Sequence, residues 1–189
     1  MILYEALVDD AFYRSLERSV SGEASTKQEA MLMYMDYSMI EAETYGELFI
    51  PDTHMHGVSV WSKPIDIRTE SERKISKNSF ILVNMGQDSF DTYAEIIEFM
   101  SLKASEIIPP ESWYLSIVGL KPSFQGQGLG STLINQVLEK TDSLNLSTYL
   151  ETFTLRNMSF YERLGYKSIA SIHEPTVDAN YWIMKRDPN

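Results

Sequence analysis

The feature that most constrains the fold is an apolar run at residues 113–120 that leads directly into closely spaced glycines. This run predicts the strongest strand of the chain, and Pro122 ends it. Gly126, Gly128 and Gly130 follow, and residues 131–141 then have the spacing of a helix. The segment therefore predicts a strand, a tight turn and a helix in immediate succession.

This turn has the properties of an anion-binding site. Glycine lacks a Cβ atom, so a ligand can approach its backbone closely. The first N–H groups of the following helix have no partner within the helix, and together with the helix dipole they suit a diphosphate. A P-loop is disfavoured because no lysine follows Gly130, and a dinucleotide motif because the pattern is GxGxG and lies late in the chain. A tight connection without a ligand remains the alternative.

A second group of polar residues lies downstream. Asn157 and Tyr161 are four residues apart in a segment that we expect to be helical, so their side chains project from the same face. Helix capping by Asn157 and ordinary packing of Tyr161 are the alternatives to a functional role.

Together these segments resemble the GCN5-related N-acetyltransferase (GNAT) family. Its acetyl-CoA loop has the pattern Q/R-x-x-G-x-G/A, which Gln125, Gly128 and Gly130 match, and Leu120-Lys121-Pro122 resembles the V-x-P end of the preceding strand. A later block of the family is matched by Asn157, Phe160, Tyr161, Gly165 and Tyr166. The match covers about residues 111–187, and residues 113–115 and 149–152 are most similar to puromycin acetyltransferases.

The resemblance implies an α/β (α+β) fold with a central, mixed and mostly antiparallel twisted sheet flanked by helices. Two neighbouring parallel strands, at 113–120 and 148–154, are implied to splay apart and to hold the pantetheine arm of acetyl-CoA in the gap. The cosubstrate-binding residues implied by the family are Val118, Gly119, Leu120, Gln125, Gly126, Gln127, Gly128, Leu129, Gly130, Ser131 and Asn157.

Hydrophobic patterning elsewhere predicts the remaining elements. Helical spacing occurs near residues 12–20, 30–38, 66–86, 89–104 and 157–164, and strand-like runs occur at 47–50, 57–61, 166–173 and 181–185. This order indicates a mixed sheet with helices packed on it. The length predicts a single domain, 1–189, which the resemblance divides into a variable acceptor-side half at 1–110 and an acetyl-CoA-binding half at 111–187.

The activity implied by the resemblance is transfer of acetyl from acetyl-CoA to a primary amine of a small molecule. Direct attack in a ternary complex is expected, because the chain has no cysteine to carry the acetyl group. A free alkylamine has a pKa of about 10, so the site must accept a proton. Glu151 is the expected base, with Glu111, His173 or a water relay as weaker alternatives. Tyr161 is the expected acid that protonates the CoA thiolate, and a backbone N–H near Val118 is expected to polarise the thioester carbonyl.

The acceptor pocket is expected to come from the first half of the chain and the last strands. The aromatic and histidine candidates for lining it are Tyr34, Tyr37, His54, His56, Trp61 and Trp182. Two other functions compete with an enzyme: a non-catalytic acyl-CoA-binding or sensor domain, and a purely structural or interaction domain. An enzyme and a sensor would both bind acetyl-CoA, but only an enzyme would release CoA faster when an amine is present.

The composition bears on the possible partners. A net charge of −11 disfavours nucleic acid and anionic membranes as partners, and it suits solubility or a cationic amine. The lack of cysteine excludes disulfides and thiolate metal sites, and with only three histidines no metal site is expected. Neither a signal peptide nor an apolar run of about 18 residues is present, so a cytoplasmic location is expected. The oligomeric state, monomer or homodimer, stays open.

Overall fold

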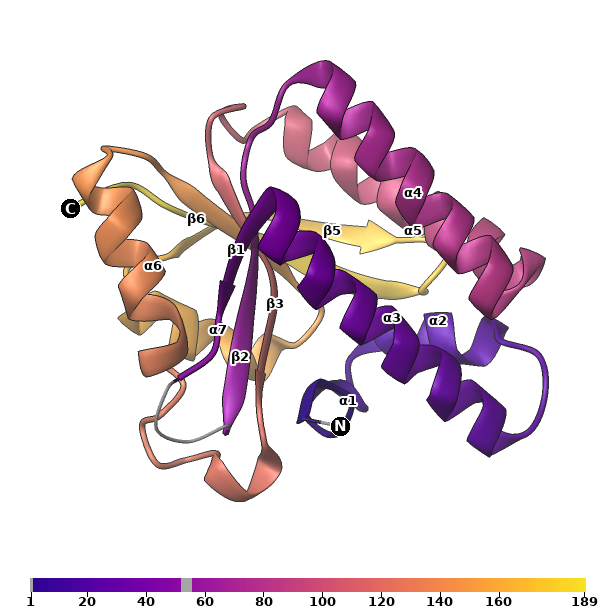
Figure 1. Ribbon diagram of the computed structural model, residues 1–189. Helices are drawn as coiled ribbons and strands as arrows, with labels where there is room; N and C mark the ends of the chain where they lie inside the picture. Colours follow the sequence, from indigo (N-terminus) through magenta and orange to yellow (C-terminus); the bar gives the residue numbers. More distant parts are fainter. Residues whose placement is uncertain (1, 52–55) are drawn as a thin grey trace.

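A six-stranded sheet forms the centre of the computed structural model, which describes residues 2–51 and 56–189 (Figure 1). The strand order is β1-β2-β3-β4-β6-β5, and every neighbouring pair is antiparallel except β3 and β4. The strands are β1 (Gly46–Phe49), β2 (Gly57–Ser62), β3 (Trp113–Leu120), β4 (Thr148–Thr152), β5 (Lys167–Glu174) and β6 (Ala179–Arg186). This mixed, mostly antiparallel sheet confirms the expected fold class.

Helices cover both faces of the sheet. They are α1 (Ile2–Leu7), α2 (Ala11–Ser19), α3 (Ala24–Tyr45), α4 (Ile67–Met85), α5 (Gln87–Ser105), α6 (Thr132–Ser143) and α7 (Leu155–Arg163), with a short 3₁₀ turn η1 (Pro122–Phe124) after β3. None of the described helices is both long and apolar enough to cross a membrane.

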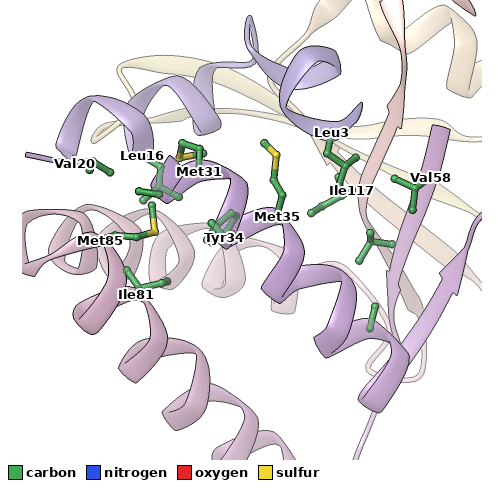
Figure 2. Close-up of a cluster of buried hydrophobic side chains, with 13 residues drawn as sticks. Leu3, Leu16, Val20, Met31, Tyr34, Met35, Val58, Ile81, Met85 and Ile117 are labelled. Atoms are coloured by element: carbon green, nitrogen blue, oxygen red, sulfur yellow. The ribbon is translucent and has the colours of Figure 1, made fainter. Parts of the chain in front are cut away.

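Alternating side chains of the strands divide the core between the two faces. On one face, Val58, Val60 and Ile117 pack against helices α1 to α4 (Figure 2). On the other face, Leu115 and Leu150 pack against α6, Tyr161 of α7 and Met184. A third cluster joins α5 to β6. Burial of this apolar surface, at about 25 cal/mol per Å², is the main force that holds the helices on the sheet.

The parallel strands β3 and β4 separate part-way along their length. They pair only at Trp113↔Thr148, Tyr114↔Tyr149 and Leu115↔Leu150, although both strands continue beyond these pairs. Beyond that point β3 stays paired with β2 and β4 stays paired with β6. The opening is therefore confined to the edge that β3 and β4 share, which confirms the expected splay.

A β-bulge lies where the separation begins. The pairing of β3 with β2 shifts between Val60 and Trp61, so Ser116 is left without a register partner. The Ser116 hydroxyl donates to the Val60 carbonyl at 3.0 Å and holds this arrangement. Because a bulge bends its strand and increases the local twist, it directs the end of β3 away from β4.

Candidate active site

The loop between η1 and α6 has an open backbone at two glycines. Gly126 and Gly128 have φ angles of +75° and +78°, a region that favours glycine. A Cβ atom built on either residue would meet no other atom within 4 Å. A ligand can therefore lie directly against this backbone.

The main-chain N–H groups of residues 126–131 donate to no other described residue. The Gln125 N–H, in contrast, already donates to the Pro122 carbonyl at 3.2 Å. The side chains of Gln125 and Gln127 donate to the carbonyls of Leu120 and Ser123, both at 3.0 Å, and brace the loop. The amides available to an anion therefore begin at Gly126, and Gln125 supports the loop through its side chain.

Gly130 has a different role from the two open glycines. A Cβ atom at this position would lie 3.1 Å from the Phe160 ring, so the missing side chain lets the start of α6 pack closely on α7. The missing side chain of Gly130 thus serves helix packing, its N–H stays open, and its part in binding a ligand stays a prediction. The same contact brings α7, and with it Tyr161, next to the glycine loop.

A cavity of about 500 Å³ lies at the gap between β3 and β4. Ser116 and Val118 line it from β3, Glu151 lines it from β4, and Asn157 and Tyr161 line it from α7. Its size is within the range of small-molecule sites. The strand gap, the expected acid and the expected base thus share one space.

The other two residues of β3 that were expected to bind the cosubstrate do not line this cavity. Gly119 lies against α1, where an added Cβ atom would come within 2.5 Å of a Leu3 methyl group. Leu120 packs beside the cluster that α6 and Trp113 form. Of the three strand residues, the structure brings only Val118 to the cavity.

Tyr161 is buried between the rings of Phe160 and Tyr166. Its hydroxyl donates to no described residue, and Tyr161 and Asn157 both line the cavity. Burial raises the pKa of the Tyr161 phenol above its usual value, followed in size by the effects of Tyr166 and Asp10. The phenol therefore keeps its proton at neutral pH, but it gives the proton up less readily than an exposed tyrosine.

Glu151 projects from β4 into the same cavity. Its Oε1 atom is buried and has no hydrogen-bond partner among the described residues. Burial raises the pKa of this carboxyl to about 8, and a hydrogen bond with Tyr114 opposes the shift. A carboxyl whose pKa lies close to working pH can both accept and return a proton, as a general base must.

The two weaker candidates for the base lie elsewhere. Glu111 is exposed ahead of β3, and His173 is an exposed residue of β5 whose Nε2 lies 3.4 Å from an Asp178 carboxylate oxygen. Neither residue lines the cavity. The geometry therefore favours Glu151.

The sequence pattern of the acetyltransferase (GNAT) family matches residues 53–166, which is more than half of the chain. The chain belongs to the GNAT family. GNAT proteins are acyltransferases that use acetyl-CoA, and the open loop and the strand gap described above both lie within the matched residues. The resemblance to puromycin acetyltransferases stays a prediction.

Solved structures with the same fold come from distant GNAT relatives. A Corynebacterium glutamicum protein named as histone acetyltransferase HPA2 and related acetyltransferase has a TM-score of 0.65 at 19% identity, over 100% of this chain and 88% of its own. Arylalkylamine N-acetyltransferase 2 from Aedes aegypti has a TM-score of 0.62 at 15% identity, over 98% and 92%. The polyamine N-acetyltransferase of Drosophila melanogaster has a TM-score of 0.60 at 11% identity, over 98% and 91%. At these identities the likeness shows a shared fold.

The aromatic residues expected around the acceptor divide into two groups. Tyr34 and Trp61 line the cavity of this GNAT protein. Tyr37 instead stacks on Phe80 with ring centroids 4.3 Å apart. His56 is buried beside Phe124, Trp182 packs beside the α6 cluster, and His54 lies outside the described residues.

Several cavity residues were not foreseen from the sequence. They come from the first half of the chain and are Asp10, Tyr13, Glu41, Arg73, Lys77 and Tyr93. Arg73 and Lys77 share a face of α4 because they are four residues apart, which is the only local signal that linked any of them. Within residues 2–51 and 56–189, no three histidine and carboxylate side chains gather as a metal site.

Proposed function

We propose that this GNAT protein transfers the acetyl group of acetyl-CoA to a primary amine of a small molecule, by direct attack in a ternary complex. The observation that carries the proposal is the gap between β3 and β4, because it opens into a cavity that both Glu151 and Tyr161 line. A thioester held in this gap would lie between a proton acceptor and a proton donor.

The donor is proposed to bind along the gap and the glycine loop. The open N–H groups of residues 126–131 would hold the diphosphate, with the dipole of α6 adding to the attraction. The unpaired edges of β3 and β4 would pair with the amides of the pantetheine arm, as an added strand does. Val118 would lie beside this arm, and Asn157, whose side chain caps no helix, would contact it.

The proposed chemistry needs one proton to leave the amine and one to reach the thiolate. The amine nitrogen attacks the thioester carbon, the new C–N bond forms and the C–S bond breaks. The Glu151 carboxylate accepts the proton that the nitrogen loses, and Tyr161 gives its proton to the departing sulfur. Proton return from Glu151 to Tyr161 through water restores both groups, so the products are the amide and free CoA.

A small amine is supported by the shape of the cavity and by the relatives. Side chains of helices α2 to α5 line the acceptor side of the cavity, and its volume of about 500 Å³ suits a compact molecule. Relatives that share the fold are named for arylalkylamines and polyamines. The amine is therefore proposed to be a small molecule.

The test is amine-dependent release of CoA. The purified protein is mixed with acetyl-CoA and a library of small amines, and free thiol is measured over time. We expect faster release with at least one amine, together with an acetylated product detected by mass spectrometry. Tight binding of acetyl-CoA without any amine-dependent release would contradict the proposal and would leave a non-catalytic acyl-CoA-binding domain.

A further inference from the structure

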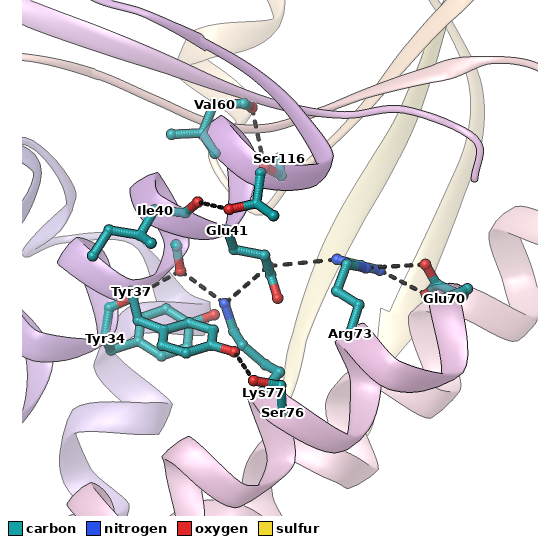
Figure 3. A network of polar contacts seen from close by, with 12 residues as sticks. Tyr34, Tyr37, Ile40, Glu41, Val60, Glu70, Arg73, Ser76, Lys77 and Ser116 are labelled. Atoms are coloured by element: carbon teal, nitrogen blue, oxygen red, sulfur yellow. Dashed lines mark hydrogen bonds and ion pairs between the residues drawn. The ribbon is translucent and has the colours of Figure 1, made fainter. Parts of the chain in front are cut away.

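A polar cluster of side chains from α3 and α4 lines the acceptor side of the cavity. Glu41 of α3 lies between Arg73 and Lys77 of α4 (Figure 3). Arg73 also forms two hydrogen bonds with Glu70, at 2.7 and 3.0 Å. Lys77 donates to the Ser38 hydroxyl at 2.9 Å and lies 4.8 Å from the centre of the Tyr34 ring.

The two oxygens of the Glu41 carboxylate are used unequally. Both cations contact Oε2, each at 3.4 Å, whereas Oε1 is buried and accepts no hydrogen bond from a described residue. A buried acceptor without a partner costs free energy that a suitable donor would recover. Glu41 lines the cavity, so a molecule bound there can supply this donor.

The charges of the cluster decide which kind of donor fits. Glu41 and Glu70 balance Arg73 and Lys77, so the cluster as a whole is neutral. A further cation would approach two positive groups that already flank the carboxylate, and like charges at short range repel. A neutral donor can bond to Oε1 without that repulsion.

Oε1 is covered in the structure, so a donor can reach it only after the Glu41 carboxylate turns about its Cγ–Cδ bond, and this torsion is soft. The two contacts to Oε2, each at 3.4 Å, are longer than most charge-assisted hydrogen bonds.

We propose that Glu41 binds the end of the acceptor remote from its reacting nitrogen, and that this end carries a neutral hydrogen-bond donor, a hydroxyl or a carboxamide N–H. The inference rests on the proposed function and names the substrate class for the same site. The acceptor then spans the cavity, with its amine near Glu151 and its neutral donor on Glu41.

The test compares amines that differ only at the remote end. CoA release is measured with an amino alcohol, the alkylamine of the same length and the diamine of the same length, for chains of four to six carbons. Tyramine and phenethylamine form a matched aromatic pair. We expect kcat/KM for the hydroxylated amine to exceed that of its plain partner by roughly tenfold or more, because its bond is to a charged acceptor.

Glu41→Gln tests the named residue. We expect this variant to lose most of the preference for the hydroxylated amine. Glu43→Gln removes the same charge from an exposed position on the same helix and should keep the preference. The preference is a ratio measured within one protein, so a general loss of activity does not alter it, and melting temperatures check that both variants fold.

Two results would overturn the inference while the proposed function survives. In the first, the wild-type protein has the same kcat/KM for all the amines. In the second, its kcat/KM is highest for the diamine, which would show that Glu41 binds a cation. Both come from the wild-type protein alone, so the test holds even if Glu41→Gln does not fold. Bound acetyl-CoA with no CoA release for any amine would overturn both.

Discussion

At the scale of single residues, the most informative group is the Glu151 carboxyl. Its pKa of about 8 in the folded protein lies above the usual value of 4.5 because the group is buried. A raised pKa means that the folded state holds its proton more tightly than the unfolded state. The stability that this gives is complete below pH 4.5 and is lost as the pH rises to about 8.

We therefore predict that Glu151→Gln, which cannot ionise, gains stability relative to the wild type as the pH rises. The difference in melting temperature should grow between pH 5 and pH 8 and then level off, as measured by thermal unfolding at each pH. The acid limb of the wild-type rate profile should also disappear in the variant. Glu111→Gln, an exposed control, should change neither. If the difference in melting temperature between the variant and the wild type stayed constant across pH, the pKa of Glu151 would not be raised in the folded protein.

At the scale of the elements, hydrophobic periodicity predicted most of the order of strands and helices, because the apolar residues of each element recur on the face that packs against the core. The strand at 113–120 was predicted with its observed bounds, and its alternating burial explains why. The strand expected at 148–154 ends at Thr152 instead, because the Thr152 hydroxyl accepts the Thr154 N–H at 3.1 Å and turns the chain into α7. Such a local side-chain bond is not visible in a hydrophobic pattern.

The loop before α6 gives a prediction for the donor side. Gly128→Ala should cost about 1–2 kcal/mol of stability, because alanine is strained at positive φ. It should also weaken acetyl-CoA binding by roughly tenfold or more, since the new methyl group occupies the space against the open backbone. Isothermal titration calorimetry measures the binding.

Gly86 between α4 and α5 provides the matched control. It too has a positive φ, +90°, and open space where a Cβ atom would lie, but it is not part of the loop. Gly86→Ala should therefore lower stability at least as much and leave acetyl-CoA binding unchanged. If both variants bound acetyl-CoA equally well, the proposal that the diphosphate binds at this loop would be wrong.

At the scale of the whole molecule, the cavity depends on both halves of the chain. The second half supplies Val118, Glu151 and Tyr161, which sequence patterns singled out. The first half supplies Glu41 and Tyr93, which no pattern marked, because their place at the cavity follows from how α3 and α5 dock on the sheet. How long helices pack on the sheet depends on contacts between distant residues, so a local sequence pattern does not predict it.

This shared cavity predicts that the chain unfolds as one unit. The first half packs on β2 and β3 through a continuous core, so heating should give a single transition in scanning calorimetry rather than two. Acetyl-CoA at 100 times its Kd should stabilise the folded state by about 2.7 kcal/mol and raise this single melting temperature by roughly 5–10 °C. Adenosine, which lacks both the diphosphate and the pantetheine arm, should give little shift. Two transitions, with only one raised by acetyl-CoA, would mean that the two halves are separate domains and that the acceptor helices fold without regard to the donor site.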